Sequence, residues 1–407
     1  TTAPSGKVQG SWKVSFDGRR YAAFEGIPYA KPPIADLRFQ SLLFHICDYY
    51  NYFSGDEDCL YLNIFVPTQG NDQQALDVVI HIHGGGFMFG SGHDFLDPKY
   101  VMDRDIILVT INYRLGVLGF LSTGDEVLPG NNGLKDQITA LKWIQQNIAS
   151  FGGNPNSVTL TGFSAGGVSV HLHYISPLSK GLFHRGMSMS GVATNDWAIE
   201  ENPLEYAKNL ANLVGCPISN TKSLVECLKT RPASLLVEKT KDLYKYPPTP
   251  VCLLKPVIEK KSEHSFLFEH PYKSLVEKNV LDVPWITSVT RDDGMIISLL
   301  LYNKLDDLNK KWTEIGPDIL EYRNLRHRTD ISNKIKDYYL GKDGQFNDNS
   351  LNQFKKMCTD KFFTINAESS AKLQSKATKS PVYFYYFNYD KGENTFTNLF
   401  TSDDRVS

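Results

Sequence analysis

Short, nearly continuous apolar runs recur along this chain and predict buried β-strands. Six such runs cover residues 76–83, 105–113, 157–163, 186–190, 284–290 and 381–389. Runs of this length beside Gly, Pro or charged residues are typical of strands that are covered on both faces. Such strands occur mainly in parallel sheets.

A helical pattern separates the second run from the third. Its apolar positions are Leu134, Ile138, Leu141, Ile144 and Ile148. Gly152 and Gly153 then end the pattern. A strand, a helix and a strand in this order predict a parallel crossover unit, so the expected fold class is α/β, a mainly parallel central sheet with helices on both faces. Residues 200–282 and 302–373 are richer in charge and predict helical excursions that form lids or pocket walls.

Composition narrows the possible partners. The 407 residues are 41% hydrophobic, which is ample for a large core. The 43 basic and 45 acidic residues form no basic cluster, so nucleic acid is not an expected partner. No stretch of 18 or more apolar residues predicts a membrane-spanning helix. The first residues, TTAPSGKVQG, contain no apolar signal segment and no initiator Met, as at a processed or engineered start.

The cysteines allow two interpretations. There are six, at Cys47, Cys59, Cys216, Cys227, Cys252 and Cys358. Cys47 lies near Cys59 and Cys216 near Cys227, and a disulfide closing either short loop stabilises a fold by about 2–4 kcal/mol. Such bonds indicate an oxidising compartment. Free buried thiols are the alternative, and composition does not separate the two.

A candidate nucleophile lies directly after the third apolar run, in LTGFSAGGVSV at residues 160–170. Ser164 stands between Gly162 and Gly166, and a helical pattern follows. A sharp strand-to-helix turn leaves no room for side chains beside the serine and pushes its hydroxyl into the site. The amides at the start of the helix then point toward the reacting group.

A glycine-rich stretch, HIHGGGFMFGSG, lies at the end of the first apolar run. The backbone amides of Gly85 and Gly86, together with that of Ala165, predict an oxyanion hole. Loss of one such donor typically costs about 2.7–4 kcal/mol of transition-state stabilisation. A phosphate-binding loop is disfavoured because no G-K-[ST] follows.

Histidine pairs and an aspartate pair complete the candidate residues. His81 with His83, and His171 with His173, form two H-x-H patterns, but neither pair has a clear third metal ligand. We therefore expect hydrogen-bonded structural histidines and no metal. Asp292 and Asp293 follow the fifth run, where one of them could orient a catalytic imidazole; a solvated acidic turn is the alternative.

Several long motifs lie in order along the chain: FEGIPYAKPPIADLRF at residues 24–39, EDCLYLNIF at 57–65, HGGGF at 83–87 and FGGNPNSVTLTGFSAGG at 151–167. Together they resemble the type-B carboxylesterase (cholinesterase-like) family. NYRLGVLGFLSTGDEVLPGNNGLKDQ at 112–137 and SPLSKGLFHRGMSMSG at 176–191 are most similar to insect carboxylesterases. The resemblance runs through nearly the whole chain. It implies an α/β-hydrolase fold that hydrolyses small-molecule carboxylic esters with a Ser–Glu/Asp–His triad and no cofactor.

The resemblance also assigns roles. Ser164 is the nucleophile, and Gly85, Gly86 and Ala165 form the oxyanion hole. Asp293, directly before the glycine of RDDG, is the triad acid, where most members have Glu. Cholinesterases usually carry Glu before the serine and many juvenile hormone esterases carry Gln, whereas this chain has Phe163. The choline-binding Trp of the first cysteine loop has no counterpart either, so a general carboxylesterase is expected.

A secreted or lumenal setting is implied as well. That setting favours disulfides between Cys47 and Cys59 and between Cys216 and Cys227. The states of Cys252 and Cys358 stay open.

The family pattern breaks at the triad base. The family's histidine follows shortly after a strand like residues 381–389, but here the chain continues as KGENTFTNLFTSDDRVS. The ten histidines are His45, His81, His83, His93, His171, His173, His184, His264, His270 and His327. His264 and His270 precede Asp293, which is the wrong side in the family order for a substitute base.

The expectation is therefore a single α/β-hydrolase domain over residues 1–407 without its C-terminal part and with impaired catalysis. A fragment, an incomplete gene model and a variant under relaxed constraint all fit this pattern. A non-catalytic cholinesterase-like binding or adhesion protein is the alternative, and the retained serine and glycines favour the esterase.

Overall fold

A nine-stranded sheet forms the centre of the computed structural model. The structure describes residues 1–34, 38–39, 55–68, 74–94, 96–244 and 252–389. The sheet has the strand order β11-β10-β9-β8-β6-β7-β5-β4-β3, and β1 and β2 form a separate two-stranded ribbon. The strands are β1 (Thr2–Ala3), β2 (Gly6–Lys7), β3 (Ser11–Val14), β4 (Arg20–Pro28), β5 (Tyr61–Pro67), β6 (Leu76–Ile82), β7 (Ile106–Ile111), β8 (Gly153–Phe163), β9 (Arg185–Met189), β10 (Trp285–Thr290) and β11 (Val382–Phe387).

The six predicted runs are all strands of this sheet, from β6 to β11, and they pair in parallel. The prediction of a mainly parallel sheet is therefore confirmed. The antiparallel strands β3, β4 and β5 at the other side were not predicted. β3 is mostly exposed and β4 alternates between buried and exposed positions, so neither forms a continuous apolar run.

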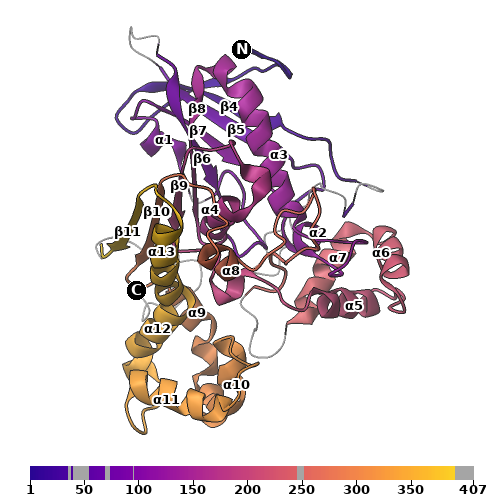
Figure 1. Ribbon diagram of the computed structural model, residues 1–407, viewed down its shortest axis with the longest axis vertical. Helices are drawn as coiled ribbons and strands as arrows, with labels where there is room; N and C mark the ends of the chain where they lie inside the picture. The colour runs from indigo at the N-terminus through magenta and orange to yellow at the C-terminus, as the bar shows by residue number, and fades with distance from the viewer. Residues whose placement is uncertain (35–37, 40–54, 69–73, 95, 245–251, 390–407) are drawn as a thin grey trace.

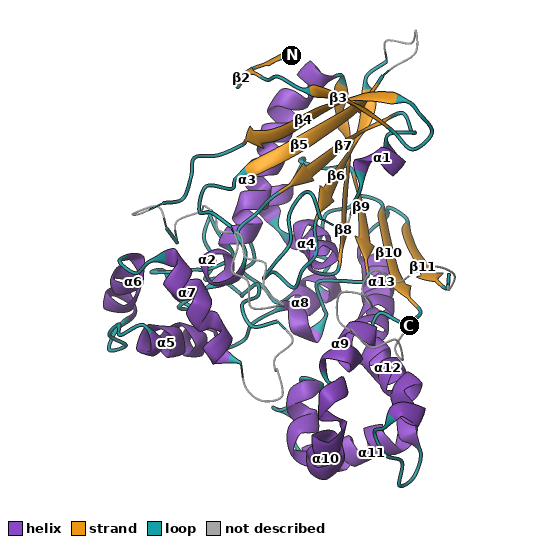
Figure 2. Cartoon of the chain, turned by 180° about the vertical axis from the view of Figure 1, so that it is seen from behind, coloured by secondary structure: helices purple, strands orange, loops and turns teal. Residues whose placement is uncertain are grey.

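Helices cover the sheet and extend beyond it. They are α1 (Pro98–Val101), α2 (Gly116–Phe120), α3 (Asn132–Asn147), α4 (Ala165–Ile175), α5 (Pro203–Leu213), α6 (Thr221–Lys229), α7 (Ala233–Thr240), α8 (Pro271–Val276), α9 (Met295–Leu300), α10 (Leu305–Ile319), α11 (Arg328–Leu340), α12 (Leu351–Thr359) and α13 (Ile365–Ala377). Figures 1 and 2 place α1 on the opposite side of the strands from α3. The crossover helices α3, α4 and α13 share one face, as right-handed connections require for this strand order.

The two charged segments are the expected helical excursions. Residues 200–282 contain α5, α6 and α7, which form a separate group beside the sheet, and residues 302–373 contain α10, α11 and α12 below it (Figure 1). Both groups lie toward the end of the sheet at which the parallel strands finish. They are therefore placed to form walls around chemistry at that end.

One of the two expected disulfides is present. Cys216 and Cys227 are bonded and join the chain after α5 to α6. Cys59 forms no disulfide with a described cysteine, and Cys47 lies outside the described residues, so the pairing of these two stays a prediction. Cys252 and Cys358 are buried free thiols.

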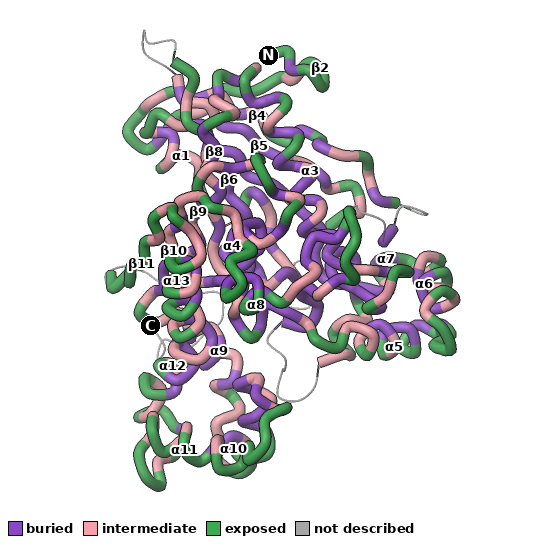
Figure 3. Tube along the Cα trace, in the orientation of Figure 1, coloured by how far each residue is buried: buried purple, intermediate pink, exposed green. Residues whose placement is uncertain are grey.

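The core lies between the central strands and the helices α3 and α4, whereas the last strand is exposed (Figure 3). Along β11 the exposed side chains are Tyr383, Phe384, Tyr385, Tyr386 and Phe387. β11 is also the edge of the sheet, so its outer backbone groups have no neighbouring strand among the described residues. An apolar edge strand of this kind is a site for association with other chains.

A buried ion pair holds α3 to the loop before α2. The side chains of Arg114 and Asp136 are almost completely buried and make two parallel hydrogen bonds, Nε to Oδ2 and Nη2 to Oδ1, each 2.7 Å long. The Arg114 backbone N–H also donates to Asp136. Since Gly116, two residues later, donates to Phe87 in the glycine-rich stretch, this pair supports the frame of the candidate oxyanion hole.

Asp136→Ala is expected to lower the free energy of unfolding by about 3–5 kcal/mol, because it leaves a buried guanidinium without its partner. Urea denaturation followed by intrinsic fluorescence measures the change. Glu126→Ala is the matched control, since the Glu126–Lys260 pair is exposed and its loss should have no measurable effect. A small effect of Asp136→Ala would mean that water reaches Arg114.

Candidate active site

Ser164 forms a strained elbow between β8 and α4. Its backbone has φ 53° and ψ −124°, a conformation that costs a non-glycine residue free energy and persists only where the surroundings enforce it. The Ser164 N–H donates to the Met189 carbonyl at 2.8 Å, and the Ser164 carbonyl accepts from Val168 at 2.9 Å. The predicted strand–turn–helix context of the serine is therefore present.

Close backbone contacts explain the glycines beside the serine. A Cβ at Gly162 would lie 2.4 Å from the Gly166 carbonyl, and a Cβ at Gly166 would lie 2.1 Å from the Ile82 carbonyl. Gly191 was not predicted, although a Cβ there would lie 2.1 Å from the Ser164 carbonyl. Side chains are therefore excluded around the elbow from α4, β8 and the end of β9.

Gly166→Ala is expected to lower the free energy of unfolding by about 3 kcal/mol, because the new methyl group must push α4 away from β6. Chemical denaturation monitored by circular dichroism measures the change. Gly181→Ala is the control: Gly181 has φ 78°, but a methyl group added there would have no atom within 4 Å, so only the conformational cost of about 1 kcal/mol is expected. Equal losses in both variants would contradict the close contact.

The glycine-rich loop packs against this elbow. A Cβ at Gly84 would lie 2.9 Å from the Phe163 carbonyl. Gly85 and Gly86 both have positive φ, 102° and 61°, and the Gly85 carbonyl accepts hydrogen bonds from Met88 and Phe89. The N–H groups of Gly85 and Gly86 donate to no acceptor within the described residues. They are thus available as hydrogen-bond donors for a ligand beside Ser164.

Asp293 lies at the end of β10 with both carboxylate oxygens hydrogen-bonded. Its Oδ1 accepts from the hydroxyls of Ser190, at 2.8 Å, and Thr290, at 2.6 Å, and its Oδ2 accepts from the Thr290 N–H at 2.9 Å. Burial raises the pKa of Asp293, the hydrogen bonds from Thr290 and Ser190 oppose this, and the charge of Asp292 adds to the rise.

The neighbouring Asp292 has a different environment. It pairs with Arg291 at 2.9 Å and with Lys355 at 3.2 Å. The contacts therefore distinguish the two aspartates: Asp292 takes part in surface ion pairs, and Asp293 faces the end of β9.

The candidate residues lie at the same end of the sheet, where the parallel strands finish. Ser164, Ser190 and Asp293 follow the neighbouring parallel strands β8, β9 and β10, and active groups of α/β proteins lie at such carboxyl ends. Ser190 and Thr290 were not predicted from the sequence. Ser190 had a usable signal, because it is the last residue of a predicted strand; in the structure it directly follows β9 and has φ 50°.

The histidines of the H-x-H patterns are engaged in internal contacts. His81 Nδ1 lies 3.2 Å from the Thr161 hydroxyl and His83 Nδ1 lies 2.8 Å from the Gly84 carbonyl. His171 accepts from the Ala193 N–H at 3.1 Å, and His173 Nε2 lies 2.9 Å from Gln137 Oε1. Burial lowers the pKa of His81 to about 4 and those of His171 and His173 to about 3, so these rings are neutral. Among the described residues, no group of three or more His, Cys, Asp or Glu is arranged to hold a metal.

The two histidines considered as substitute bases point elsewhere. His270 Nδ1 accepts from the Tyr272 N–H at the start of α8, and His264 is exposed beside Glu263. No hydrogen bond joins either ring to Ser164 or Asp293 in the part of the chain that the structure describes.

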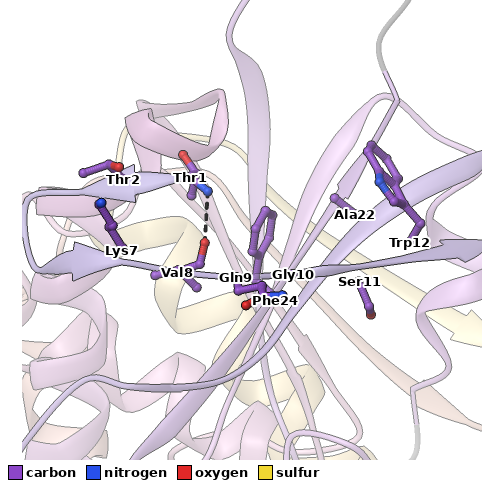
Figure 4. Close-up of a pocket in the computed structure, with 10 residues that line it drawn as sticks. All are labelled: Thr1, Thr2, Lys7, Val8, Gln9, Gly10, Ser11, Trp12, Ala22 and Phe24. Carbon is purple, nitrogen blue, oxygen red and sulfur yellow. Dashed lines mark hydrogen bonds between the residues drawn. The ribbon is translucent and has the colours of Figure 1, made fainter.

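Two hollows of the surface lie apart from these residues. One, of about 660 Å³, is lined by the N-terminal residues and by β3 and β4, with Trp12 and Phe24 among its lining residues (Figure 4). There the Thr1 amino group donates to the Val8 carbonyl at 3.0 Å. The second, of about 450 Å³, lies at the C-terminal end of α4. Neither hollow is lined by a predicted site residue.

The model of the Carboxylesterase family matches residues 1–41 and 45–404. The chain belongs to the carboxylesterase family. It is 41% identical to a carboxylic ester hydrolase of Bombus ignitus over 94% of this chain and 73% of that protein. It is 37% identical to juvenile hormone esterase of Tribolium castaneum over 98% of this chain and 74% of that protein.

A solved structure agrees with this assignment. The crystal structure of juvenile hormone esterase from Manduca sexta, with OTFP covalently attached, superposes with a TM-score of 0.85 at 28% identity and covers 98% of this chain and 80% of that chain. The fold is therefore the α/β-hydrolase fold, and this carboxylesterase is a serine carboxylic-ester hydrolase. Within the described residues, no helix is both long and apolar enough to cross a membrane.

Proposed function

We propose that this carboxylesterase chain uses Ser164 as the nucleophile that forms an acyl-enzyme intermediate with small aryl or aliphatic esters. The Ser164 hydroxyl gives its proton to a base and attacks the ester carbonyl. The oxyanion accepts hydrogen bonds from the N–H groups of Gly85, Gly86 and Ala165. Collapse of the tetrahedral intermediate releases the alcohol, and water then frees the acid from the acyl-serine. The observation that carries this proposal is the strained elbow of Ser164 packed against the glycine loop.

Asp293 is proposed as the triad acid. Its carboxylate is fixed by the hydroxyls of Ser190 and Thr290, and the Thr290 N–H holds the second oxygen. A carboxylate held in this way orients an imidazole and stabilises its charged form during attack. An Asp reaches less far than the Glu of most family members, and the hydrogen bonds to Thr290 keep it close to the end of β10.

The general base is the triad member that the described residues of the 407-residue chain do not supply. None of its ten histidines follows β11, and no hydrogen bond joins a histidine to Ser164 or Asp293 among the described residues. His45 lies outside the described residues. We therefore propose that catalysis by this chain is impaired, because the described residues place no imidazole beside Ser164 and Asp293.

The substrate proposal is a general carboxylic ester without a choline group. Phe163 precedes the serine, and its ring stacks on His81 with centroids 6.3 Å apart. The residue at this position therefore offers an aromatic ring and no carboxylate to a quaternary ammonium group. Juvenile hormone esterases are among the relatives, but the carboxylic ester hydrolase of Bombus ignitus is more similar to this chain, at 41% identity against 37% for the enzyme of Tribolium castaneum.

A secreted or lumenal setting is proposed on two observations. The disulfide between Cys216 and Cys227 requires an oxidising compartment to persist. A relative that is 40% identical is a venom carboxylesterase of Apis mellifera.

Prolonged incubation with a fluorophosphonate at alkaline pH tests the nucleophile, since hydroxide then replaces the missing base. Peptide mapping by mass spectrometry should find the phosphonyl group on Ser164, and Ser164→Ala should remain unlabelled at that peptide. Labelling of another residue in both proteins, with Ser164 untouched, would overturn the assignment.

A further inference from the structure

A second concave site lies at the far end of the helix that carries Ser164. The hollow of about 450 Å³ is formed by the C-terminal end of α4, the turn that follows it, residues 261–269 and residues 274–281. α4 is 11 residues long, so this hollow, which we name the α4-end pocket, lies roughly 16 Å along the helix from Ser164. It is therefore separate from the proposed ester site.

The interior of the α4-end pocket is apolar. Ile175, Phe266 and Leu267 line it, and Phe266 and Leu267 are almost fully buried. Val280 and Leu281 complete the lining, and both are half-buried. These side chains can contact a hydrocarbon or aromatic group and remove it from water.

The rim of the α4-end pocket is positively charged. Lys180 and Lys261 line it, and neither forms an ion pair with a described residue. The Lys261 ammonium lies 4.8 Å from the centre of the Phe268 ring, which holds it at the rim. Glu269 also lines the pocket, but its carboxylate is occupied by Lys273 at 2.8 Å and by the Ser274 hydroxyl at 2.8 Å.

The C-terminal end of α4 does not cancel the positive charge of the pocket rim. The C-terminal carbonyls of a helix carry partial negative charge and would repel an anion. Here the Leu172 carbonyl accepts from the Ser176 N–H, and the Tyr174 carbonyl accepts from the Leu281 N–H at 2.8 Å. These carbonyls are engaged, so the ammonium groups of Lys180 and Lys261 dominate the electrostatics of the rim.

We propose that the α4-end pocket binds a small amphipathic carboxylate. The tail packs against the half-buried side chains of Ile175 and Leu281, and the carboxylate lies between Lys180 and Lys261. The volume is in the range of about 300–1,000 Å³ that is usual for small-molecule sites. The ligand class is that of fatty acids and aryl-alkanoic acids, and binding does not depend on Ser164.

Isothermal titration calorimetry of the 407-residue chain with decanoate tests the proposal, and 1-decanol serves as the neutral ligand with the same tail. Decanoate should bind with one-to-one stoichiometry, and decanol about tenfold more weakly, because it lacks the charge-assisted hydrogen bonds. Val280→Trp should abolish binding by filling the pocket. The double variant Lys180→Glu with Lys261→Glu changes only exposed side chains and should weaken decanoate binding by at least about tenfold while decanol binding is unchanged.

Lys278→Glu is the matched control, since this exposed lysine lies on the same segment but does not line the pocket. It should bind decanoate like the unmodified chain. The proposal is overturned if no decanoate binds, if decanol binds equally well, or if the pocket variants bind decanoate as the unmodified chain does. That last result would place the fatty acid elsewhere, for example beside Ser164.

Discussion

The 407-residue chain is expected to hydrolyse 4-nitrophenyl acetate only about 10³–10⁴-fold faster than water does, far below ordinary esterases. This residual activity comes from the oxyanion hole and substrate binding, because Ser164 has no histidine to accept its proton among the described residues. Initial rates measured against buffer give the acceleration. A kcat within the usual range of about 1–10³ s⁻¹ would show that another group in this chain acts as the base.

Two variants separate the contribution of Ser164 to the residual rate from that of the oxyanion hole. Ser164→Ala should reduce the residual rate only a few-fold, because triad members act as a unit and the loss of one already removes most of their effect. Ala165→Pro deletes one proposed oxyanion donor at the first position of α4, where proline is compatible with a helix. It should remove about 10²-fold of the residual acceleration. If both variants match the unmodified chain, the residual rate does not arise at this site.

The second large effect is on association. The 407-residue chain, expressed alone, is expected to elute from size-exclusion chromatography as a mixture of oligomers, because β11 exposes aromatic side chains on both faces of an edge strand. Tyr383 on one face is 57% exposed and Tyr386 on the other is 51% exposed.

Phe384→Lys combined with Tyr386→Lys should shift the protein to a monomer, since charged side chains on an edge strand prevent pairing between chains. Tyr338→Lys is the control: Tyr338 is 78% exposed but lies on α11, away from the strand, and its replacement should leave the elution profile unchanged. A sharp monomer peak for the unmodified chain, together with one cooperative melting transition, would show that β11 does not promote association between chains.

The parts of the fold that could be predicted are those whose local structure is decided by the burial of apolar side chains. β6 and β7 are largely apolar, so their burial was evident from composition alone. β3 is largely exposed, and its pairing with β4 depends on partners elsewhere in the chain, which a local pattern does not contain.

The candidate active site shows the same difference between features with a local sequence signal and features that depend on distant residues. Gly162 and Gly166 beside Ser164 indicate the elbow, because backbone crowding there excludes side chains. Gly191 serves the same purpose from the end of β9, but its role depends on a contact with Ser164 across the sheet, so no nearby residue in the sequence signals it. Asp292 and Asp293 are chemically identical, and only their contacts in space distinguish the ion pair from the candidate triad acid.

The strand order also bears on how the chain folds during synthesis. β6, β7, β8 and β9 pair with one another within residues 76–189, so the Ser164 elbow and the glycine loop can form as soon as this segment is complete. β10 can pair with β9 only after the long helical excursion between Gly186 and its partner Trp285 has been synthesised. Contacts across such separations form slowly. Asp293 therefore joins the nucleophile late. Until β10 docks, the partly folded chain exposes the side of β9 as an open edge, which makes this interval the period in which a chaperone is most useful.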